Sequence, residues 1–202
     1  LRFPYFTSDG VLKGIKIKNK KKIFTYEGVS TDTLFAQHLF PSTGKRIVVT
    51  EGELDAASCY EAMPGWPMVS LPHGAASAKK DCQKQIPLFQ GYEEIILFFD
   101  TDDAGRKAVE ETASILPPGK VKIARLEGYK DASEALQAND AEAIRKAIWD
   151  AKAYRPDGII DGKTLLEIVT TPQAPYDHEY PFEGLNKKLH GIRYGELVTF
   201  TA

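Results

Sequence analysis

Short apolar segments alternate with amphipathic segments between residues 46 and 150, and this alternation limits the possible fold more than any other feature. One apolar segment, residues 95–99, contains only Ile, Leu and Phe. Strands that are apolar throughout are buried on both faces, as in parallel sheets covered by helices. The alternation therefore predicts an α/β fold with a parallel sheet flanked by helices.

The same pattern predicts the order of the elements. Strands are expected at 47–50, 68–71, 94–99 and 121–125, with helices at 54–63, 76–86 and 104–116 and further helices up to Trp149. Apolar residues at helical spacing are expected to face the core. They are Leu54, Ala57 and Tyr60 in the first helix, and Ala108, Val109 and Ile115 in the third. We expect this sheet domain to occupy residues 46–152.

The flanking segments have different patterns. Residues 11–26 alternate apolar and basic side chains around a Lys-rich turn, which predicts a β-hairpin within a small, mixed α+β, basic subdomain over residues 1–45. Residues 153–181 contain more Pro and Gly and are expected to be a linker with one docking helix, Gly162–Thr170. Residues 182–202 are expected to begin a further folded unit, with a strand-like stretch at 197–200.

The net charge of −2 conceals an uneven distribution. Residues 1–50 carry nine Lys/Arg against three Asp/Glu, whereas residues 51–150 carry eleven against eighteen. This polarity suits a first lobe that attracts a polyanion and a second that gathers carboxylates around a cation. The alternative is an ordinary solvated charged face.

The cysteines and the apolar runs exclude several classes of protein. Cys59 and Cys82 stand apart without CxxC spacing, so we expect neither a disulfide framework nor a zinc site. The longest apolar runs are too short to cross a bilayer and the first residues lack a signal-peptide pattern. We therefore expect a cytoplasmic protein without a membrane partner.

Three acidic residues follow two of the predicted strands directly. Glu51 comes after the strand at 47–50, and Asp100 and Asp102 come after the strand at 94–99. The carboxyl ends of parallel strands share one edge of a sheet, where α/β proteins place their active sites. Residues two apart on an extended segment point the same way. We therefore expect the carboxylates of Glu51, Asp100 and Asp102 to meet.

Converging carboxylates raise one another's pKa unless a cation lies among them. Mg²⁺ is the expected ion, with Mn²⁺ as a substitute, because it binds a few carboxylates and bridges to substrate phosphates. This arrangement predicts phosphoryl-transfer chemistry. The alternative is that Asp102 or Asp103 is only a helix N-cap and Glu51 only a surface residue.

Several sequence motifs carry a family resemblance. The runs VVTEGELD at 48–55 and FDTDDAGRKA at 99–108 resemble the TOPRIM signature of primases and topoisomerases, and KDASE at 130–134 resembles an element that supplies a further acid in primases. The run SLPHGA at 70–75, with Lys79 and Lys80 after it, is most similar to T7-like phage primase-helicases and to the related mitochondrial Twinkle helicase. The resemblance extends over the whole chain.

This resemblance implies a DNA primase, a nucleotidyltransferase that makes short RNA primers on single-stranded DNA during replication. The parent polypeptide would also be an ATP-dependent helicase, whose domain would start at 182–202. The resemblance gives Glu51, Asp100 and Asp102 catalytic and metal-binding roles, with Asp55 and Asp131 as supporting acids of the metal cluster. Asp55 can equally be an acid favoured by the helix dipole, and Asp131 can be an N-cap.

Basic residues supply the candidate contacts to phosphates. The resemblance implies that the hairpin binds template DNA through Lys16, Lys18, Lys20 and Lys22, in contacts that position the strand without reading its sequence. The candidates for binding the phosphates of a nucleotide are His73, Lys79, Lys80, Arg106 and Lys130. Simple solvent exposure is the alternative for the turn lysines and for His73, Lys79 and Lys80.

The implied partners are single-stranded DNA, NTPs, the helicase domain of the same polypeptide and, through the linker helix, neighbouring subunits of a ring. A phage protein of this kind would act in the bacterial cytoplasm, whereas a Twinkle-like one would act in the mitochondrial matrix or nucleoid. Two other functions remain open. One is a TOPRIM nuclease that uses water as the nucleophile, and the other is a catalytically silent DNA-binding or assembly module of a Twinkle-like helicase.

Overall fold

The structure is a computed structural model that describes residues 1–19, 23–29, 32–155, 162–171, 176–195 and 197–199. It divides into two compact units, Leu1–Asp157 and Gly158–Ala202. The first unit contains both the hairpin region and the predicted sheet domain. Lys20 and Lys22 lie outside the described residues.

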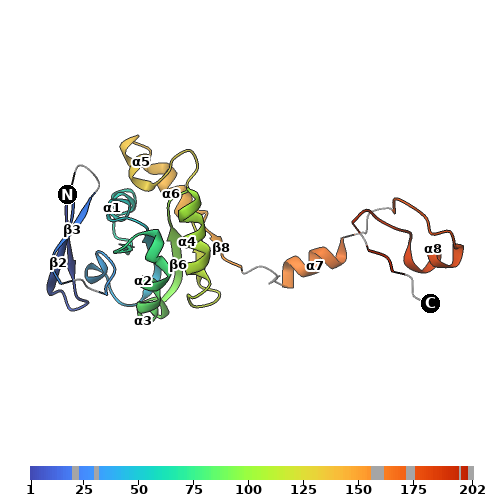
Figure 1. Cartoon of the computed structure of the whole chain (residues 1–202), viewed down its shortest axis with the longest axis horizontal. Coiled ribbons are helices and arrows are strands. Elements are labelled where there is room, and N and C mark those ends of the chain that lie inside the picture. The colour runs from blue at the N-terminus through green and yellow to red at the C-terminus, as the bar shows by residue number, and fades with distance from the viewer. Residues whose placement is uncertain (20–22, 30–31, 156–161, 172–175, 196, 200–202) are drawn as a thin grey trace. The chain divides into compact units, whose positions relative to one another are not determined.

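The first unit is built on a five-stranded sheet of order β5-β4-β6-β7-β8 (Figure 1). Four strands are parallel and the edge strand β8 is antiparallel to β7. The bounds are β4 Gly44–Thr50, β5 Met68–Ser70, β6 Tyr92–Phe98, β7 Val121–Ile123 and β8 Lys152–Ala153. The predicted α/β fold with a parallel sheet is confirmed. Strand β8 was not predicted, because two residues are too few to show a periodic pattern.

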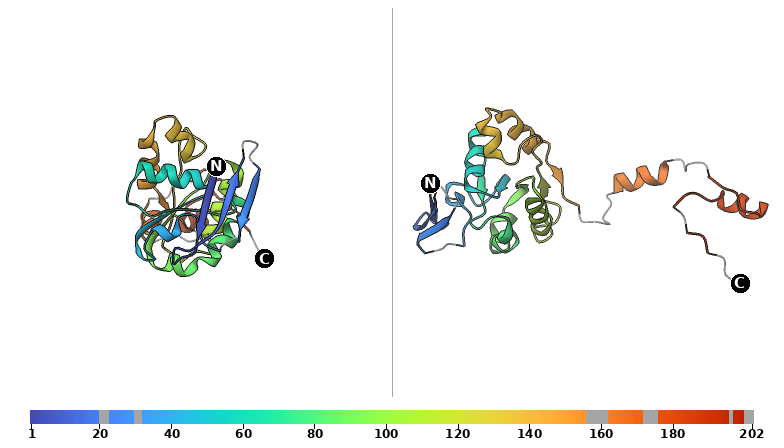
Figure 2. Two further views of the ribbon diagram at one scale, coloured as in Figure 1. Left: turned by 90° about the vertical axis from the view of Figure 1, so that its left-hand side faces the viewer. Right: turned by 45° about the horizontal axis from the view of Figure 1, so that its top comes forward.

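Helices cover both faces of this sheet (Figures 1 and 2). One face carries α1 Glu53–Ala62, α5 Ala132–Gln137 and α6 Ala141–Trp149, and the other carries α2 Ala78–Lys84, α3 Ile86–Gln90 and α4 Asp103–Ala113. Alternate residues of β6 feed the two cores: Ile95 and Leu97 pack on the α2–α4 side, while Ile96 and Phe98 pack on the α1–α5–α6 side. Burial on both faces is the physical reason that this strand is apolar throughout.

The predicted core face of α1 was wrong. Leu54 is 37% and Tyr60 44% exposed, and Ala57 is exposed too. The buried stripe lies one residue earlier, on Glu53, Ala56 and Cys59. Small side chains occupy much of this helix, so its large apolar residues were a poor guide to the packed face. In α4 the prediction was right for Ala108 and Val109, and Ile115 packs partly buried against the same core.

The single helix predicted at 76–86 is instead a short 3₁₀ turn, Ala75–Ser77, followed by two helices, α2 and α3. Helix α3 has a proline at its first turn. Proline lacks the N–H that would continue the preceding helix but is well suited to start a new one. This explains the break.

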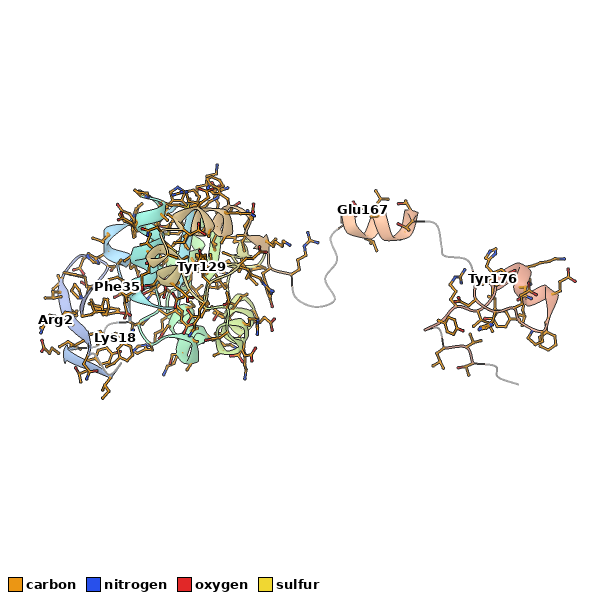
Figure 3. All side chains as sticks on the ribbon, turned by 90° about the horizontal axis from the view of Figure 1, so that it is seen from above. Arg2, Lys18, Phe35, Tyr129, Glu167 and Tyr176 are labelled. Atoms are coloured by element: carbon orange, nitrogen blue, oxygen red, sulfur yellow. The ribbon has the colours of Figure 1, made fainter. Side chains whose placement is uncertain are left out.

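A second, three-stranded antiparallel sheet precedes the large one, with strand order β1-β2-β3. Its strands are β1 Arg2–Phe6, β2 Leu12–Lys18 and β3 Phe24–Gly28, so the predicted hairpin is confirmed. The rings of Phe3 and Tyr5 contact Phe35, at centroid distances of 5.9 and 5.6 Å. Figure 3 labels Phe35, together with Arg2 and Lys18 of the hairpin sheet. A 3₁₀ turn, Gln37–Leu39, then leads towards β4.

The second unit contains α7 Gly162–Thr170, with the bounds predicted from the sequence, and α8 Glu183–Leu189. An isolated antiparallel bridge joins His178 and Ile192. The strand-like stretch expected at 197–200 was wrong over its described part, because residues 197–199 form no strand. A strand needs a hydrogen-bonded neighbour, and the described residues provide none there. None of the described helices combines the length and the apolar character needed to cross a bilayer.

Candidate active site

The acidic residues lie at the carboxyl edge of the large sheet. Strands β4 and β6 pair in register, with Thr50 opposite Phe98. Glu51 follows the end of β4 directly and Asp100 lies two residues past the end of β6, so both reach the same edge. They line one cavity of about 700 Å³ together with Asp55, Lys130 and Asp131. We refer to this cavity as the acid-edge cavity.

Lys130 forms ion pairs with two of the predicted site acids, Asp100 and Asp102. Its Nζ lies 3.4 Å from an oxygen of Asp100 and 3.2 Å from an oxygen of Asp102. The backbone holds it there, because the N–H of Thr101 donates to the carbonyl oxygen of Lys130 at 3.0 Å. These ion pairs raise the pKa of Lys130, Asp102 contributing most through its hydrogen bond.

Asp102 has a structural role as well. It is the N-cap of α4, and its carboxylate accepts a hydrogen bond from the N–H of Gly105 at 2.9 Å. That bond, with Lys130, lowers the pKa of Asp102. The side chain is 46% exposed and does not line the acid-edge cavity. Asp102 is therefore the N-cap of α4 through one carboxylate oxygen, and its other carboxylate oxygen lies beside Lys130.

The two acids that follow β4 and β6 are in unfavourable surroundings for a charge. Burial raises the pKa of Glu51, and the charge of Asp100 raises it further. Burial also raises the pKa of Asp100, with a second contribution from Asp131. Raised carboxyl pKa values in a cavity indicate a site where a cation would be bound favourably.

Asp55 connects α1 to α5, and Asp131 begins α5. Asp55 accepts a hydrogen bond from the N–H of Ser133 at 3.0 Å, yet burial raises its pKa to about 7. Asp131 is the N-cap of α5 and accepts from the N–H of Glu134 at 2.8 Å. Asp55 is thus more than a solvated acid of the first helical turn. For Asp131 the N-cap interpretation is confirmed.

The donor set fits a divalent cation in chemistry. Glu51 accepts a hydrogen bond from the N–H of Ala75 through Oε1 at 3.3 Å, whereas its buried Oε2 has no hydrogen-bond partner among the residues that the structure describes. An unpartnered buried carboxylate oxygen is costly unless a cation or a donor reaches it. Within the described part of the chain no three acidic, His or Cys side chains converge at ligand distance. The carboxylates of Glu51, Asp100 and Asp102 were expected to meet, but in the described structure they do not converge on one point, although each supplies hard oxygen donors.

The hairpin lysines differ from one another. Lys18 lines the acid-edge cavity, with its Nζ 5.5 Å from the centre of the Phe24 ring. Lys16 was expected as an exposed contact to DNA, but only 7% of its side chain is exposed. Its Nζ lies 2.6 Å from Glu53 and donates to the carbonyl oxygen of Pro72 at 2.7 Å. Lys16 thus turns inward and joins the hairpin sheet to α1 and to the loop that follows β5.

The candidate phosphate contacts are also divided. His73 and Lys130 line the acid-edge cavity. Lys79 and Lys80 are exposed on α2 and do not line it, and Arg106 pairs with Asp103 on the exposed first turn of α4. The structure therefore brings two of the five predicted residues to the cavity.

Sequence reasoning missed other residues around this cavity. The aromatic side chains of Phe24 and Tyr26 line it and are 44% and 50% exposed. Their spacing of two along a strand was a usable signal, since such residues share a face. Glu53 and Asp81 are buried acids, and nothing in the sequence distinguishes them from surface acids.

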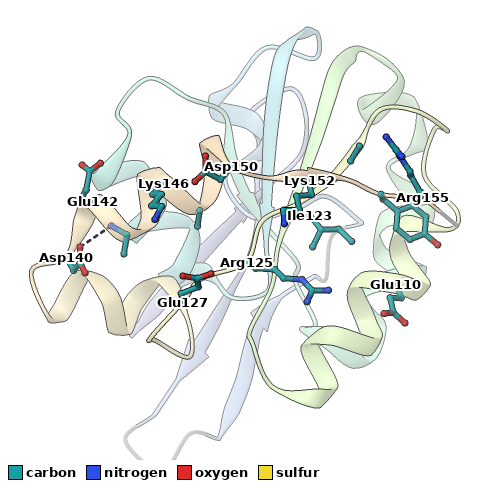
Figure 4. A pocket seen from close by; sticks show the side chains of 14 residues that line it. Glu110, Ile123, Arg125, Glu127, Asp140, Glu142, Lys146, Asp150, Lys152 and Arg155 are labelled. Atoms are coloured by element: carbon teal, nitrogen blue, oxygen red, sulfur yellow. Dashed lines mark hydrogen bonds between the residues drawn. The ribbon is translucent and has the colours of Figure 1, made fainter. Parts of the chain in front are cut away.

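A larger cavity lies elsewhere, between α4, α6 and the strands β7 and β8 (Figure 4). It has a volume of about 1030 Å³ and contains none of the predicted site residues. Acidic and basic side chains alternate around it, including Arg125, Glu127 and Lys146. Its size alone does not indicate chemistry, so the acid-edge cavity remains the candidate active site.

Comparisons with known proteins identify the family of the chain. Residues 48–136 match the family described as Toprim-like. The DNA helicase/primase of enterobacteria phage T3 is 41% identical over 204 residues, which cover 98% of this chain and 36% of the relative. The Twinkle homolog protein, chloroplastic/mitochondrial, of Arabidopsis thaliana is 27% identical over 230 residues, which cover 100% of this chain and 31% of the relative.

A solved structure gives the same result. It contains bacteriophage T7 lagging-strand DNA polymerase with the primase domains of two gp4 subunits bound to an RNA/DNA hybrid and dTTP. The match has 41% identity and a TM-score of 0.71, and it covers 76% of this chain and 78% of the other. The present chain spans about a third of the length of the two curated relatives. The chain therefore belongs to the family of T7-like phage DNA helicase/primases and carries the Toprim-like region of that family.

Proposed function

We propose that this chain is the RNA-polymerising core of a DNA primase, which extends RNA on a single-stranded DNA template. The observation that carries the proposal is the set of carboxylates at the carboxyl edge of the sheet, with Glu51 and Asp100 in one cavity and Lys130 beside them. Relatives that are helicase/primases support it, as does the solved T7 assembly of a DNA polymerase with two gp4 primase domains, which is bound to an RNA/DNA hybrid and dTTP.

The proposed reaction joins a nucleotide 3′-hydroxyl to the α-phosphate of an incoming NTP. A bond forms between the 3′-oxygen and the α-phosphorus, the bond from that phosphorus to the β-phosphate oxygen breaks, and pyrophosphate leaves. Glu51, Asp100 and Asp102 would hold a divalent cation, Mg²⁺ or Mn²⁺, with Asp55 and Asp131 in support. The ion would supply positive charge beside the reacting phosphate.

The chain's own residues have distinct parts in this proposal. Lys130, beside Asp100, would contact the phosphates of the nucleotide. Oε2 of Glu51 makes no hydrogen bond to the described part of the chain, and it would be available to a cation or to the proton of the attacking hydroxyl. Arg106, Lys79 and Lys80 would reach the nucleotide only after a change of side-chain conformation, because they do not line the cavity.

The hairpin sheet would hold the template strand. Lys18 offers a charge to the DNA backbone, and the exposed rings of Phe24 and Tyr26 offer faces on which bases can stack. Lys20 and Lys22, outside the described residues, would add phosphate contacts. Lys16 would contribute by holding the hairpin sheet against α1 through its ion pair with Glu53.

The proposal extends to the parent polypeptide. Residues 153–181 would connect this core to a helicase domain, with α7 docking on a neighbouring subunit of a ring, and residues 182–202 would lead into that domain. The template would be single-stranded DNA, the substrates NTPs, and the setting the cytoplasm of a bacterial host.

Extension of a short RNA annealed to single-stranded DNA, with labelled NTPs and Mg²⁺, tests the proposal. We expect product growth by the wild-type chain and a loss of about 100-fold or more in Glu51→Gln, Asp100→Asn and the double variant. Glu110→Gln and Asp150→Asn are matched controls, because these acids line the other cavity. Extension that survives in the double variant would refute the proposal.

The same assay separates the two alternatives. Shortening of the nucleic acid, rather than growth that depends on NTPs, would indicate a Toprim nuclease. Binding of single-stranded DNA with neither growth nor shortening would indicate an assembly module. The first outcome gives shortened products and the second leaves the nucleic acid unchanged, so the assay distinguishes them.

A further inference from the structure

A histidine and a buried aspartate form a pair beside the acid-edge cavity. Nδ1 of His73 lies 3.0 and 3.1 Å from the two carboxylate oxygens of Asp81 on α2. Asp81 is only 4% exposed, so its carboxylate has little access to water. A buried carboxylate needs a donor to offset its lost hydration, and the ring N–H of His73 provides one.

The loop that carries His73 is fixed at points on both sides of it. The carbonyl oxygen of Pro72 accepts a hydrogen bond from Lys16, and the N–H of Ala75 donates to Glu51. Between them Gly74 has φ 70° and ψ −169°, a conformation that is essentially restricted to glycine. A Cβ at this position would lie 3.8 Å from Oε1 of Glu51. His73 is therefore held on a rigid loop that touches a predicted catalytic acid.

The other ring nitrogen of His73 is available to a ligand. The side chain is 38% exposed and lines the acid-edge cavity, whereas Asp81 does not. Because Nδ1 is occupied by Asp81, Nε2 is the ring atom left for the cavity. Over the described ranges of the chain, no hydrogen bond of Nε2 is found.

Binding of a polyphosphate in this cavity requires a cationic side chain. Glu51, Asp55, Asp100 and Asp131 would repel a polyphosphate. Three lysines line the cavity. Lys16 is paired with Glu53, and Lys130 is shared between two aspartates. Lys18 lies on the hairpin sheet beside the ring of Phe24, whereas His73 lies on the loop that contacts Glu51. A cationic imidazole whose own counter-ion is buried outside the cavity can still attract phosphate.

We infer that His73, held by Asp81, binds the β- or γ-phosphate of the incoming nucleoside triphosphate through Nε2–H. When the ring carries both protons, Nδ1–H donates to Asp81 while Nε2–H donates to a phosphate oxygen. Asp81 is a positioning residue, because it acts through the imidazole. The inference rests on the proposed function and adds to it the residue pair that selects a triphosphate.

Equilibrium binding of fluorescent ATP and of AMP to the full chain tests this inference, with Mg²⁺ and again with EDTA. For His73→Ala we expect the dissociation constant of ATP to rise about tenfold and that of AMP to change less than about twofold. Asp81→Asn keeps the size of the side chain and an acceptor but loses the charge, so it should weaken ATP binding to a smaller extent. His38→Ala, which removes a histidine stacked on Phe6 outside the cavity, is the control and should bind as wild type.

A double-mutant cycle separates positioning from mere stabilisation of the fold. If Asp81 acts through His73, Asp81→Asn has no further effect on ATP binding in the His73→Ala background. Additive losses, or equal losses for ATP and AMP, would overturn the inference, as would unchanged ATP binding by His73→Ala. If His73→Ala binds ATP as wild type does and the wild-type chain still extends RNA, only this inference is refuted. If His73→Ala weakens ATP binding selectively but the wild-type chain does not extend RNA, only the proposed function is refuted.

Discussion

At the scale of one residue, the buried carboxylate of Asp55 is a group in the candidate site that lowers the stability of the fold when it is charged. Its carboxylate receives a single hydrogen bond, from the N–H of Ser133, and lies among Asp131, Asp100 and Glu51. Burial and these neighbours raise its pKa to about 7. An acid kept in such surroundings is more easily explained by ligand binding than by folding.

The first prediction concerns the effect of pH on Asp55→Asn. The folded-state pKa, about 7, exceeds that of an unfolded Asp, about 3.9, so the folded state holds the proton more tightly. The resulting stability is fully present below about pH 4 and is lost as the pH rises through about 7. Without divalent ions, Asp55→Asn should therefore be more stable than wild type by about 1–3 kcal/mol at pH 8, and nearly equal to it at pH 4.

Urea unfolding at the two pH values measures this difference. The asparagine can still accept from Ser133 through its amide oxygen, so the hydrogen bond does not confound the result. A variant less stable than wild type at pH 8 would show that the charge of Asp55 is well accommodated. Added Mg²⁺ should stabilise wild type more than Asp55→Asn if the acid cluster binds the ion.

Lys16 and Glu53 present a different case, because here the buried charges satisfy each other. Both side chains are 7% exposed, and Tyr5 donates a further hydrogen bond to Glu53 at 2.7 Å. Removing one partner of a buried pair leaves the other charge uncompensated, which typically costs about 3–5 kcal/mol. We predict a loss of this size in the free energy of unfolding for Lys16→Met.

The matched double variant, Lys16→Met with Glu53→Leu, removes both charges and should recover much of that loss. Urea unfolding at pH 7 gives the comparison. If both single variants and the double variant lose less than about 1 kcal/mol, the pair is not a significant link between the hairpin sheet and α1.

At the scale of elements, the start of α4 is the tightest junction near the site. A Cβ on Gly105 would lie 2.3 Å from the carbonyl oxygen of Asp100 and 2.9 Å from its carbonyl carbon. Alanine is favoured over glycine inside a helix by about 1 kcal/mol, which would stabilise the variant. Overpacking against backbone that cannot move aside lowers the free energy of unfolding, by about 1–3 kcal/mol or more.

We therefore predict that Gly105→Ala destabilises the first unit, because the steric term exceeds the gain in helix propensity. Thermal unfolding should show a lower midpoint, and RNA extension should fall because Asp100 moves with the helix start. Gly184→Ala, in α8, makes the same exchange where a Cβ would meet nothing within 4 Å, so it is the control. A Gly105→Ala chain as stable as wild type would mean that α4 is free to shift.

The sequence predicted elements best where both faces of a strand are buried. Residues 95–99 have the apolar pattern of a central strand, and residues 95–98 form the second half of β6. Helix α1 was less well predicted, because Ala56, Ala57, Ser58 and Cys59 are all small and its packed face is set by neighbouring elements. Strand β8 depends wholly on pairing with β7, which no local pattern can reveal.

For the site, the sequence located the acids because strand order fixes which residues reach one edge of a sheet. It could not locate Lys16 or Asp81 correctly, since burial of a charged side chain depends on a distant partner. Lys16 meets Glu53, and Asp81 meets His73, only after the chain has folded. Pairings of this kind involve residues whose local sequence resembles that of any exposed polar segment.

At the scale of the whole molecule, the packed cores belong to one unit. All residues of the two hydrophobic clusters lie between Leu34 and Tyr154, within Leu1–Asp157. By contrast, Leu165, Leu166 and Val169 of α7 are 50–73% exposed. A unit with its own core folds alone as a rule.

The last prediction is therefore that a chain of residues 1–157 unfolds cooperatively, with a free energy within about 0.5 kcal/mol of that of the same unit in the full chain. The reason is that the cores, the buried Lys16–Glu53 pair and the acid-edge cavity are all retained. Urea unfolding followed by tryptophan fluorescence reports on this unit alone, because Trp66 and Trp149 are the two tryptophans of the sequence. A lower unfolding midpoint for the shortened chain would show that residues beyond 157 stabilise the first unit, whereas an equal midpoint with ATP binding intact would establish that unit as sufficient for nucleotide binding.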